Sequence, residues 1–208
     1  MTDSVRGPGR PAGSSGADLV AVARGVFLER GYAGTSMDEV AKRAKISKAS
    51  LYREHSSKPA LFAAVVRDWA HAGRDAMRPA LARLGESGDV RAGLVELGET
   101  MRAGILSAPV LEMRRLVTAE ATARPDVAER YLEESWNANI ANLAAALQGI
   151  SEQGRLQIED AHAAAEQFTW LVIGAPLNAQ LLGGAPAGVD VSRAVELFLA
   201  GYGVDSSR

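Results

Sequence analysis

The sequence predicts an all-α protein, with a small N-terminal group of helices followed by a larger C-terminal helical bundle, about nine helices in all. Two observations predict this class. From Ala17 onward the apolar residues recur at intervals of three, four and seven, which is the period of a helix with one buried face. No segment alternates apolar and polar residues convincingly enough for a half-buried strand.

The first helix is expected to begin at Ala17 and to stop at Gly31, since glycine is common just after the end of a helix. The residues before it, 1–16, are rich in Gly, Pro and Ser and are predicted to form a disordered basic tail. Within the tail, Arg6–Pro11 contains a Gly-Arg-Pro core that could enter an A·T-rich minor groove. The simpler interpretation of this segment is a flexible tail without such a contact.

Hydroxyl residues mark the starts of the next helices. The segment Thr35–Glu39 places a hydroxyl three residues before an acid, the spacing of a capping box that opens a second helix. Ser47 is positioned to cap a third helix, whose inward residue is Leu51, and Ser57 to cap a fourth. Three short helices and the start of a longer one are therefore expected in the N-terminal domain, residues 17–75.

The remaining residues, 76–208, keep the helical pattern and are predicted to form a second domain. Glycine, proline or acidic residues mark the joints between its helices. Beyond the fourth helix, we expect helices at about 89–107, 109–122, 126–152, 159–182 and 190–202.

The composition is that of a globular protein, with 47% hydrophobic and 23% charged residues. The absence of cysteine excludes disulfides and suits a reducing compartment. The N-terminus lacks the apolar core of a signal peptide, and no uncharged apolar run approaches the roughly 18 residues needed to span a bilayer. We therefore expect a cytoplasmic protein with no membrane partner.

Positive charge is concentrated in the N-terminal domain. Residues 1–75 carry 12 Lys or Arg and 8 Asp or Glu, a net charge of +4, whereas the rest carries 11 and 17, a net charge of −6. All four lysines of the chain lie within 17 residues: Lys42, Lys45, Lys48 and Lys58. This asymmetry predicts an anionic partner for the N-terminal domain, although chance unevenness would give the same counts.

Two short helices joined by a tight turn, over about residues 36–55, form a helix-turn-helix. In this motif the first residues of the second helix reach base edges in the major groove of DNA. The candidate base contacts are therefore Ser47, Lys48, Ala49 and Ser50. Tyr52 can donate its hydroxyl to a phosphate. Together with Lys48 and Ser50, it is expected to bind the operator. Further phosphate contacts are expected from helix starts and the turn: Thr35, Ser36, Lys45 and Lys58.

The same segment carries a family pattern over about residues 17–69, at Phe27, Gly31-Tyr32, Thr35-Ser36, Val40-Ala41, Ala44, Ile46-Ser47-Lys48, Leu51-Tyr52, Ser57-Lys58 and Leu61-Phe62. It resembles the tetracycline-repressor (TetR) family of bacterial transcriptional regulators. Leu116–Tyr131 and Ala165–Phe168 also resemble the C-terminal domain of one branch of that family. The resemblance implies a homodimer with an N-terminal DNA-binding domain and a larger helical ligand-binding domain.

Three residues depart from the family pattern. Lys45 stands in the turn where glycine is usual, and in a left-handed conformation lysine costs on the order of 1 kcal/mol. Glu54 stands where histidine is common, and because a carboxylate repels phosphate we expect it to pair with Arg53 or Lys58. His55 stands where an aromatic residue packs inward, and its spacing from Leu51 places it on the core face.

Wide apolar faces on the last two helices predict a homodimer, since a single chain would struggle to cover both. By the family resemblance, these helices pair with their two-fold mates in a four-helix interface. A core within one chain is the alternative. The expected interface residues are Phe168, Leu171, Val172, Ala175, Leu182, Val195, Phe198, Leu199 and Tyr202.

Soft, aromatic and amide side chains on the middle helices could line a pocket for an apolar effector. Each of them could equally be part of an ordinary core. The adjacent Arg114-Arg115 could meet an anionic ligand or could simply be solvated. The candidate pocket residues are Met101, Leu106, Met113, Trp136, Asn137, Trp170 and Asn178.

Enzyme signatures are missing from the sequence. His55, His71 and His162 do not have the spacing of metal ligands, and no nucleophile elbow or phosphate-binding loop is present. We expect no metal and no cofactor. The sequence thus predicts a dimeric, ligand-responsive transcriptional regulator, with a repressor favoured. The alternative is a protein-interaction scaffold derived from a helix-turn-helix, with weak or no DNA binding.

Overall fold

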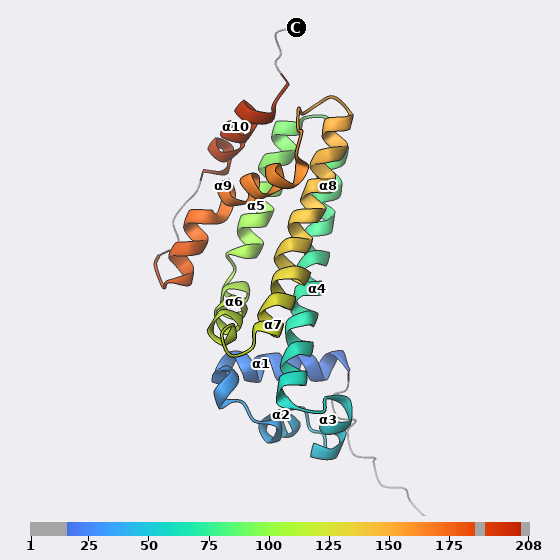
Figure 1. Ribbon diagram of the computed structural model, residues 1–208, viewed down its shortest axis with the longest axis vertical. Coiled ribbons are helices and arrows are strands. Elements are labelled where there is room, and N and C mark those ends of the chain that lie inside the picture. Colours follow the sequence, from blue (N-terminus) through green and yellow to red (C-terminus); the bar gives the residue numbers. More distant parts are fainter. Residues whose placement is uncertain (1–15, 186–189, 205–208) are drawn as a thin grey trace, which may run out of the picture. The chain divides into compact units, whose positions relative to one another are not determined.

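The computed structural model describes residues 16–185 and 190–204 (Figure 1). These residues form α-helices and one π-helical segment, and a single bridge between Leu156 and Gly203 is their only β-type pairing. The all-α prediction is therefore confirmed. Nearly all of the predicted basic tail lies outside the described residues. The chain divides into two compact units between Val65 and Val66, and we call them the N-terminal unit and the C-terminal unit.

The N-terminal unit, blue to cyan in Figure 1, holds four helical segments. They are α1 (Ala17–Gly34), α2 (Met37–Arg43), α3 (Lys48–Glu54) and the start of α4 (Lys58–Glu86). Gly31, with φ 66° and ψ 175°, interrupts the helical backbone of α1, as the sequence predicts. A positive φ of this kind favours glycine, so the chain turns here before it enters α2.

Serine side chains cap three of these helices, as predicted. Ser36 Oγ and Ser47 Oγ each accept the backbone N–H three residues later, at 3.1 and 3.0 Å. Ser57 Oγ accepts its corresponding N–H at 3.3 Å. Each such cap contributes about 1 kcal/mol to stability, so the three serines fix where the helices around the turn begin.

Three aromatic rings form the core of the N-terminal unit. The Phe62 ring lies 5.0 Å, centroid to centroid, from both Phe27 and Tyr32, and both phenylalanine side chains are fully buried. Leu51 of α3 is also fully buried. Because Leu51 is inward, the other side chains in the first turns of α3 are left on the surface.

The C-terminal unit holds the rest of α4 and seven further segments, green to red in Figure 1. They are α5 (Val90–Ile105), α6 (Ala108–Glu120), α7 (Pro125–Tyr131), the π-helical η1 (Leu132–Asn137), α8 (Ala138–Glu152), α9 (Ala161–Leu181) and α10 (Val191–Tyr202). Asp89, Asp160 and Asp190 cap α5, α9 and α10 through their carboxylates. The predicted single helix over 126–152 is instead divided by η1.

The core of the C-terminal unit corrects the predicted dimer surface. Four predicted interface residues are at most 2% exposed: Phe168, Val172, Val195 and Phe198. The rings of Phe168 and Phe198 pack at 5.2 Å. A side chain buried within its own chain cannot contact a second copy, so the alternative of an internal core holds for these four. Helical periodicity identifies an apolar face but not the neighbour that covers it.

Gly98 of α5 lies against Val191 of α10. A Cβ added to Gly98 would lie 2.5 Å from Cγ1 of Val191, a branched side chain with little freedom to move. We expect Gly98→Ala to lower the free energy of unfolding by roughly 1–3 kcal/mol through overpacking, measured by urea denaturation. Gly104→Ala on the same helix is the control, because no atom lies within 4 Å of its Cβ position. Equal stability of the two variants would contradict this packing.

Candidate DNA-binding surface and ligand pocket

The turn between α2 and α3 contains a lysine in the left-handed conformation. Lys45 has φ 58°, as the family pattern of glycine at this position suggested. The next residue, Ile46, donates its N–H to the carbonyl of Ala41 at 3.1 Å, which closes the turn. Lysine in this region costs on the order of 1 kcal/mol, so Lys45 lowers the free energy of unfolding while its ammonium stays exposed.

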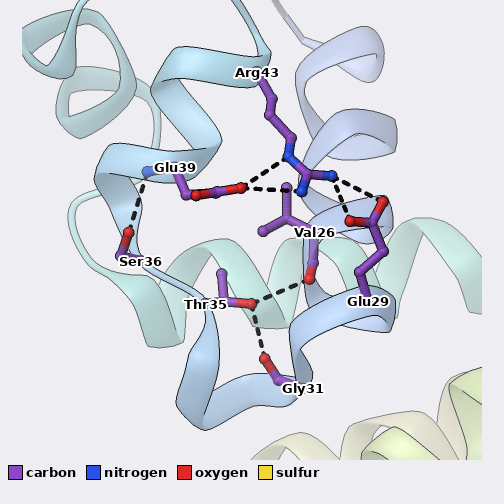
Figure 2. A network of polar contacts seen from close by, with 7 residues as sticks. All are labelled: Val26, Glu29, Gly31, Thr35, Ser36, Glu39 and Arg43. Carbon is purple, nitrogen blue, oxygen red and sulfur yellow. Dashed lines mark hydrogen bonds and ion pairs between the residues drawn. The ribbon is translucent and has the colours of Figure 1, made fainter.

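An arginine with two carboxylates fastens α2 to α1 (Figure 2). Arg43 Nη1 lies 2.7 Å from Glu29 Oε2 on α1, and Nη2 lies 3.0 Å from Glu39 Oε1 on α2. Hydrogen bonds to Glu29 and then to Glu39 raise the pKa of Arg43 above its ordinary value. The guanidinium therefore stays charged, and its fork shape suits this two-sided contact. Arg43 thus holds α2, the first helix of the helix-turn-helix, in position against α1.

Thr35 has an internal role that sequence reasoning did not anticipate. Its side chain is 3% exposed, and its hydroxyl lies 2.8 Å from the Gly31 carbonyl and 3.3 Å from the Val26 carbonyl, to which it can donate (Figure 2). A buried hydroxyl held this way joins the end of α1 to the start of α2. The predicted phosphate contact by the Thr35 side chain is therefore wrong, because the side chain is buried and both of its contacts are internal. Ser36, which caps α2, stays exposed.

The first turns of α3 form an exposed polar surface, which we call the α3 surface. It comprises Ser47, Lys48, Ala49, Ser50 and Tyr52. Ser50 is half-buried, with its Oγ 2.9 Å from Ser47 Oγ, and Tyr52 is 48% exposed. Lys48 pairs with the Asp38 carboxylate of α2. The structure thus brings the predicted base contacts together on one helix start.

Lys58 is more enclosed than the other lysines. Its Nζ donates to the Ala33 carbonyl at 3.2 Å and lies 4.4 Å from the centroid of the Tyr32 ring. Both contacts hold α4 against α1, so Lys58 contributes to packing in the free protein. A phosphate contact by Lys58 stays a prediction, and it would have to be made alongside or in place of these contacts.

Glu54 and His55 end α3 in different surroundings. Glu54 is exposed, and its Oε2 accepts the N–H of Gly16 at 3.3 Å. Its expected pairing with Arg53 or Lys58 stays a prediction. His55 is half-buried, and its N–H donates to the Leu51 carbonyl at 2.8 Å. These two departures from the family pattern therefore lie at the end of α3, away from its first turn.

The C-terminal unit contains an apolar cavity of about 270 Å³, which we call the pocket. Helices α4, α5, α6, α8 and α9 and the π-helical η1 all contribute to its lining. Met101 and Trp136 line it, as predicted. Its other apolar walls come chiefly from Trp69, Met77, Leu81, Leu97, Ile105, Val110, Ile140 and Leu143.

Five residues predicted for the pocket lie elsewhere. Met113 is fully buried in packing, and Leu106 packs against the core. Trp170 is 53% exposed and lies outside the lining, with its ring tilted against that of Trp136 at 5.3 Å between centroids. Asn137 and Asn178 are exposed. The sequence analysis missed the contribution of α4, although Trp69, Gly73, Ala76 and Met77 have the spacing of one helix face.

Three polar groups in the pocket lining have buried atoms with no hydrogen-bond partner among the described residues. They are Nε of Arg114, Oδ1 of Asn139 and Oγ1 of Thr169. Arg114 also lies 5.0 Å from the centroid of the Trp136 ring. By contrast, the neighbouring Arg115 is exposed and donates to the Gln180 and Leu181 carbonyls. Buried polar atoms are rarely left unpaired, so the pocket has unused hydrogen-bonding capacity.

Comparison with known families identifies the fold. Residues 19–65 match the family model of bacterial regulatory proteins of the tetR family. Residues 92–204 match the model of the C-terminal domain of AefR-like transcriptional repressors, and this match alone covers over half of the chain. The chain belongs to the TetR family. It is accordingly a transcriptional regulator with a DNA-binding helix-turn-helix, and not an enzyme.

Solved structures of TetR-family proteins share this fold. A regulator of the TetR family from Mesorhizobium loti is 29% identical, with a TM-score of 0.85, over 89% of this chain and 95% of that one. The flavonoid-responsive regulator FrrA is 27% identical, with a TM-score of 0.74, over 90% of this chain and 96% of that one.

A curated relative matches a shorter segment. The HTH-type transcriptional activator FasR of Mycolicibacterium smegmatis is 40% identical over 73 residues, 30% of this chain. The match spans 33% of the length of FasR.

None of the helices in the described part of the chain has the length and apolar character of a membrane span.

Proposed function

We propose that this TetR-family protein is a ligand-responsive repressor that binds a near-palindromic operator as a homodimer. A small, largely apolar effector would enter the pocket and weaken operator binding. The chain would meet its operator in the cytoplasm. The observation that carries this proposal is the combination of an exposed, polar α3 surface in one unit with a pocket containing unpaired polar groups in the other.

The α3 surface supports base contact through its first turn. Lys48 and Ser50 would face base edges, and Ala49 would contact a thymine methyl. Tyr52, Ser36 and Lys45 would hold phosphates. The ion pair between Lys48 and Asp38 is no obstacle, since both side chains are over 60% exposed and an exposed pair contributes only about 0–1 kcal/mol.

The dimer proposal rests on apolar side chains that α9 and α10 leave exposed. Trp170 is 53% exposed, Leu182 81% and Leu197 62%. A surface hollow between the two helices is lined by Trp170, Leu171, Leu197 and Tyr202, among others. An apolar patch of this kind is typical of an interface, and two-fold symmetry would pair it with itself. Ala175 and Leu199 complete the proposed surface.

The direction of regulation is proposed from the C-terminal unit. Its family model describes repressors and covers over half of the chain, whereas the activator FasR matches over 30% of it. Operator contact by itself serves either outcome, because repression and activation differ in where the operator lies relative to the promoter. We therefore infer repression from the longer of the two matches.

A salt titration tests operator binding. The protein is titrated with the DNA upstream of its own gene and with a scrambled duplex of equal length. We expect the upstream DNA to bind about 10³-fold or more tightly, with a steep negative dependence on salt. Equal binding of both duplexes would mean that only charge is recognised. No binding at low salt would favour the scaffold interpretation.

Lys45 is expected to lower the stability of the protein and to raise its affinity for DNA. Lys45→Gly should raise the free energy of unfolding by about 1 kcal/mol, because glycine adopts positive φ without strain. It should also weaken operator and scrambled DNA alike and lower the salt slope by about 1 for each subunit of the dimer. Lys45→Ala is the control, since it removes the same charge but keeps the strain. Unchanged DNA binding in both variants would exclude a phosphate contact by Lys45.

A further inference from the structure

We propose that the pocket binds an amphipathic monoanion, a carboxylate or similar acid on a compact apolar body, with its acid group paired to Arg114. This proposal rests on the ligand-responsive function proposed above and names the chemical class of the ligand. It follows from the charge, the unpaired polar atoms and the size of the pocket.

The charge of the pocket comes from Arg114. Among the lining residues that the structure describes, Arg114 is the one that carries a charge, and the others are apolar or neutral polar. Its Nε is buried without a hydrogen-bond partner among the described residues. Arg114 is half-buried, and a partly buried guanidinium gains from an anion that accepts its N–H groups. The pocket is therefore electrostatically suited to an anion and unsuited to a cation.

The contact between Arg114 and Trp136 orients the cation. The guanidinium carbon lies 5.0 Å from the centroid of the Trp136 ring, which also lines the pocket. This interaction uses the ring face and does not consume the N–H groups, which lie in the guanidinium plane. A carboxylate matches those N–H groups and accepts charge-assisted hydrogen bonds from them.

The neutral polar atoms limit the ligand to one acid group. The Asn139 side-chain amide donates to the Ser135 carbonyl at 2.8 Å, which leaves Oδ1 as a buried, unpaired acceptor. A second carboxylate near Oδ1 would be repelled, whereas a hydroxyl or N–H of the ligand would be accepted. Thr169, 2% exposed with an unpaired Oγ1, can accept or donate. A hydroxyl on the ligand would therefore add affinity.

The remaining walls set the size and polarity of the ligand body. At about 270 Å³, the pocket lies near the lower limit of the roughly 300–1,000 Å³ found for ligand sites. Its walls include Met77, Leu81, Leu97 and Met101. Flexible methionines adapt to different shapes, so a compact aryl or short alkyl body fits this space.

Calorimetric titration of the full-length protein tests the proposal without DNA. The probes are naphthalene-2-carboxylate and octanoate, each compared with its neutral amide at the same pH. We expect each acid to bind about tenfold or more tightly than its amide, the difference that one charge-assisted hydrogen bond provides. Amides that bind as tightly as the acids, or failure of both acids to bind below about 1 mM, would overturn the proposal.

Variants of two arginines test whether the preference for the acid over the amide arises at Arg114. Arg114→Met should bring the affinity for each acid down to about that for its amide, whereas Arg114→Lys should retain part of the preference for the acid. Arg130→Met, an exposed arginine of α7 outside the lining, is the matched control and should bind both probes as the parent does. Acid preference that survives in Arg114→Met would place the anion elsewhere and overturn the assignment.

The operator assay separates the two proposals. If an acid binds through Arg114 but operator affinity does not change, the ligand class stands and the proposed ligand response fails. If the operator is bound specifically but neither acid binds, the proposed ligand class is wrong and the DNA-binding function stands.

Discussion

Leu197→Glu is expected to convert the protein to a monomer and to lower its operator affinity by about 10²–10⁴-fold. Leu197 is 62% exposed on α10 within the proposed interface. A buried carboxylate without a partner costs several kcal/mol, and a two-fold interface contains the change twice. Once the subunits separate, the second recognition helix no longer binds at a high effective concentration, which is the origin of the loss. Sedimentation velocity and the operator titration measure the two effects.

Leu132→Glu is the matched control for this substitution. Leu132 is 50% exposed but lies on η1, outside the α9 and α10 surface. We expect this variant to remain dimeric, since surface substitutions usually change stability within about 0.5 kcal/mol. A Leu197→Glu protein that stays dimeric would mean that α9 and α10 do not form the interface. A monomer with full operator affinity would mean that dimerisation is not required.

Phe62→Ala is expected to lower the stability of the N-terminal unit by about 3–5 kcal/mol, the usual range for removing a buried phenylalanine. The Phe62 side chain is fully buried and contacts two of the aromatic rings in that core. Operator binding should fall because α3 loses its support. Hydrogen exchange should show the loss of protection in α1, α2 and α3.

Phe62→Leu serves as the comparison, since it keeps most of the volume and should cost less than about 1.5 kcal/mol. Nearly equal losses for the two variants would indicate that ring packing is not what stabilises this core. Retained protection in α1 to α3 of Phe62→Ala would contradict the central role given to Phe62.

Features determined by nearby residues could be predicted from the sequence. The caps at Ser36 and Ser47 follow from a hydroxyl close to its own N–H target. The chain turn at Gly31 follows from a local backbone preference, whereas the left-handed Lys45 was suggested by the family pattern of glycine at that position. The helix-turn-helix was predictable because its spacing and its inward Leu51 are properties of one short segment.

Features determined by packing between distant segments were harder to predict. The apolar faces of α9 and α10 were found, but Phe198 faces the core and Leu197, its neighbour in sequence, faces outward. The pocket requires side chains from α4 as well as the middle helices, and no local signal relates them. The break of a long helix by η1 likewise has no sequence signal that we identified.

The distribution of lysine makes the two units chemically distinguishable. Every lysine lies in the N-terminal unit, and three of the four are exposed. An amine-acylating reagent therefore modifies side chains in that unit alone, and each acylation removes a positive charge. The pocket contains an arginine but no amine. Acylation would thus reduce attraction to DNA and leave the side chains of the pocket unmodified.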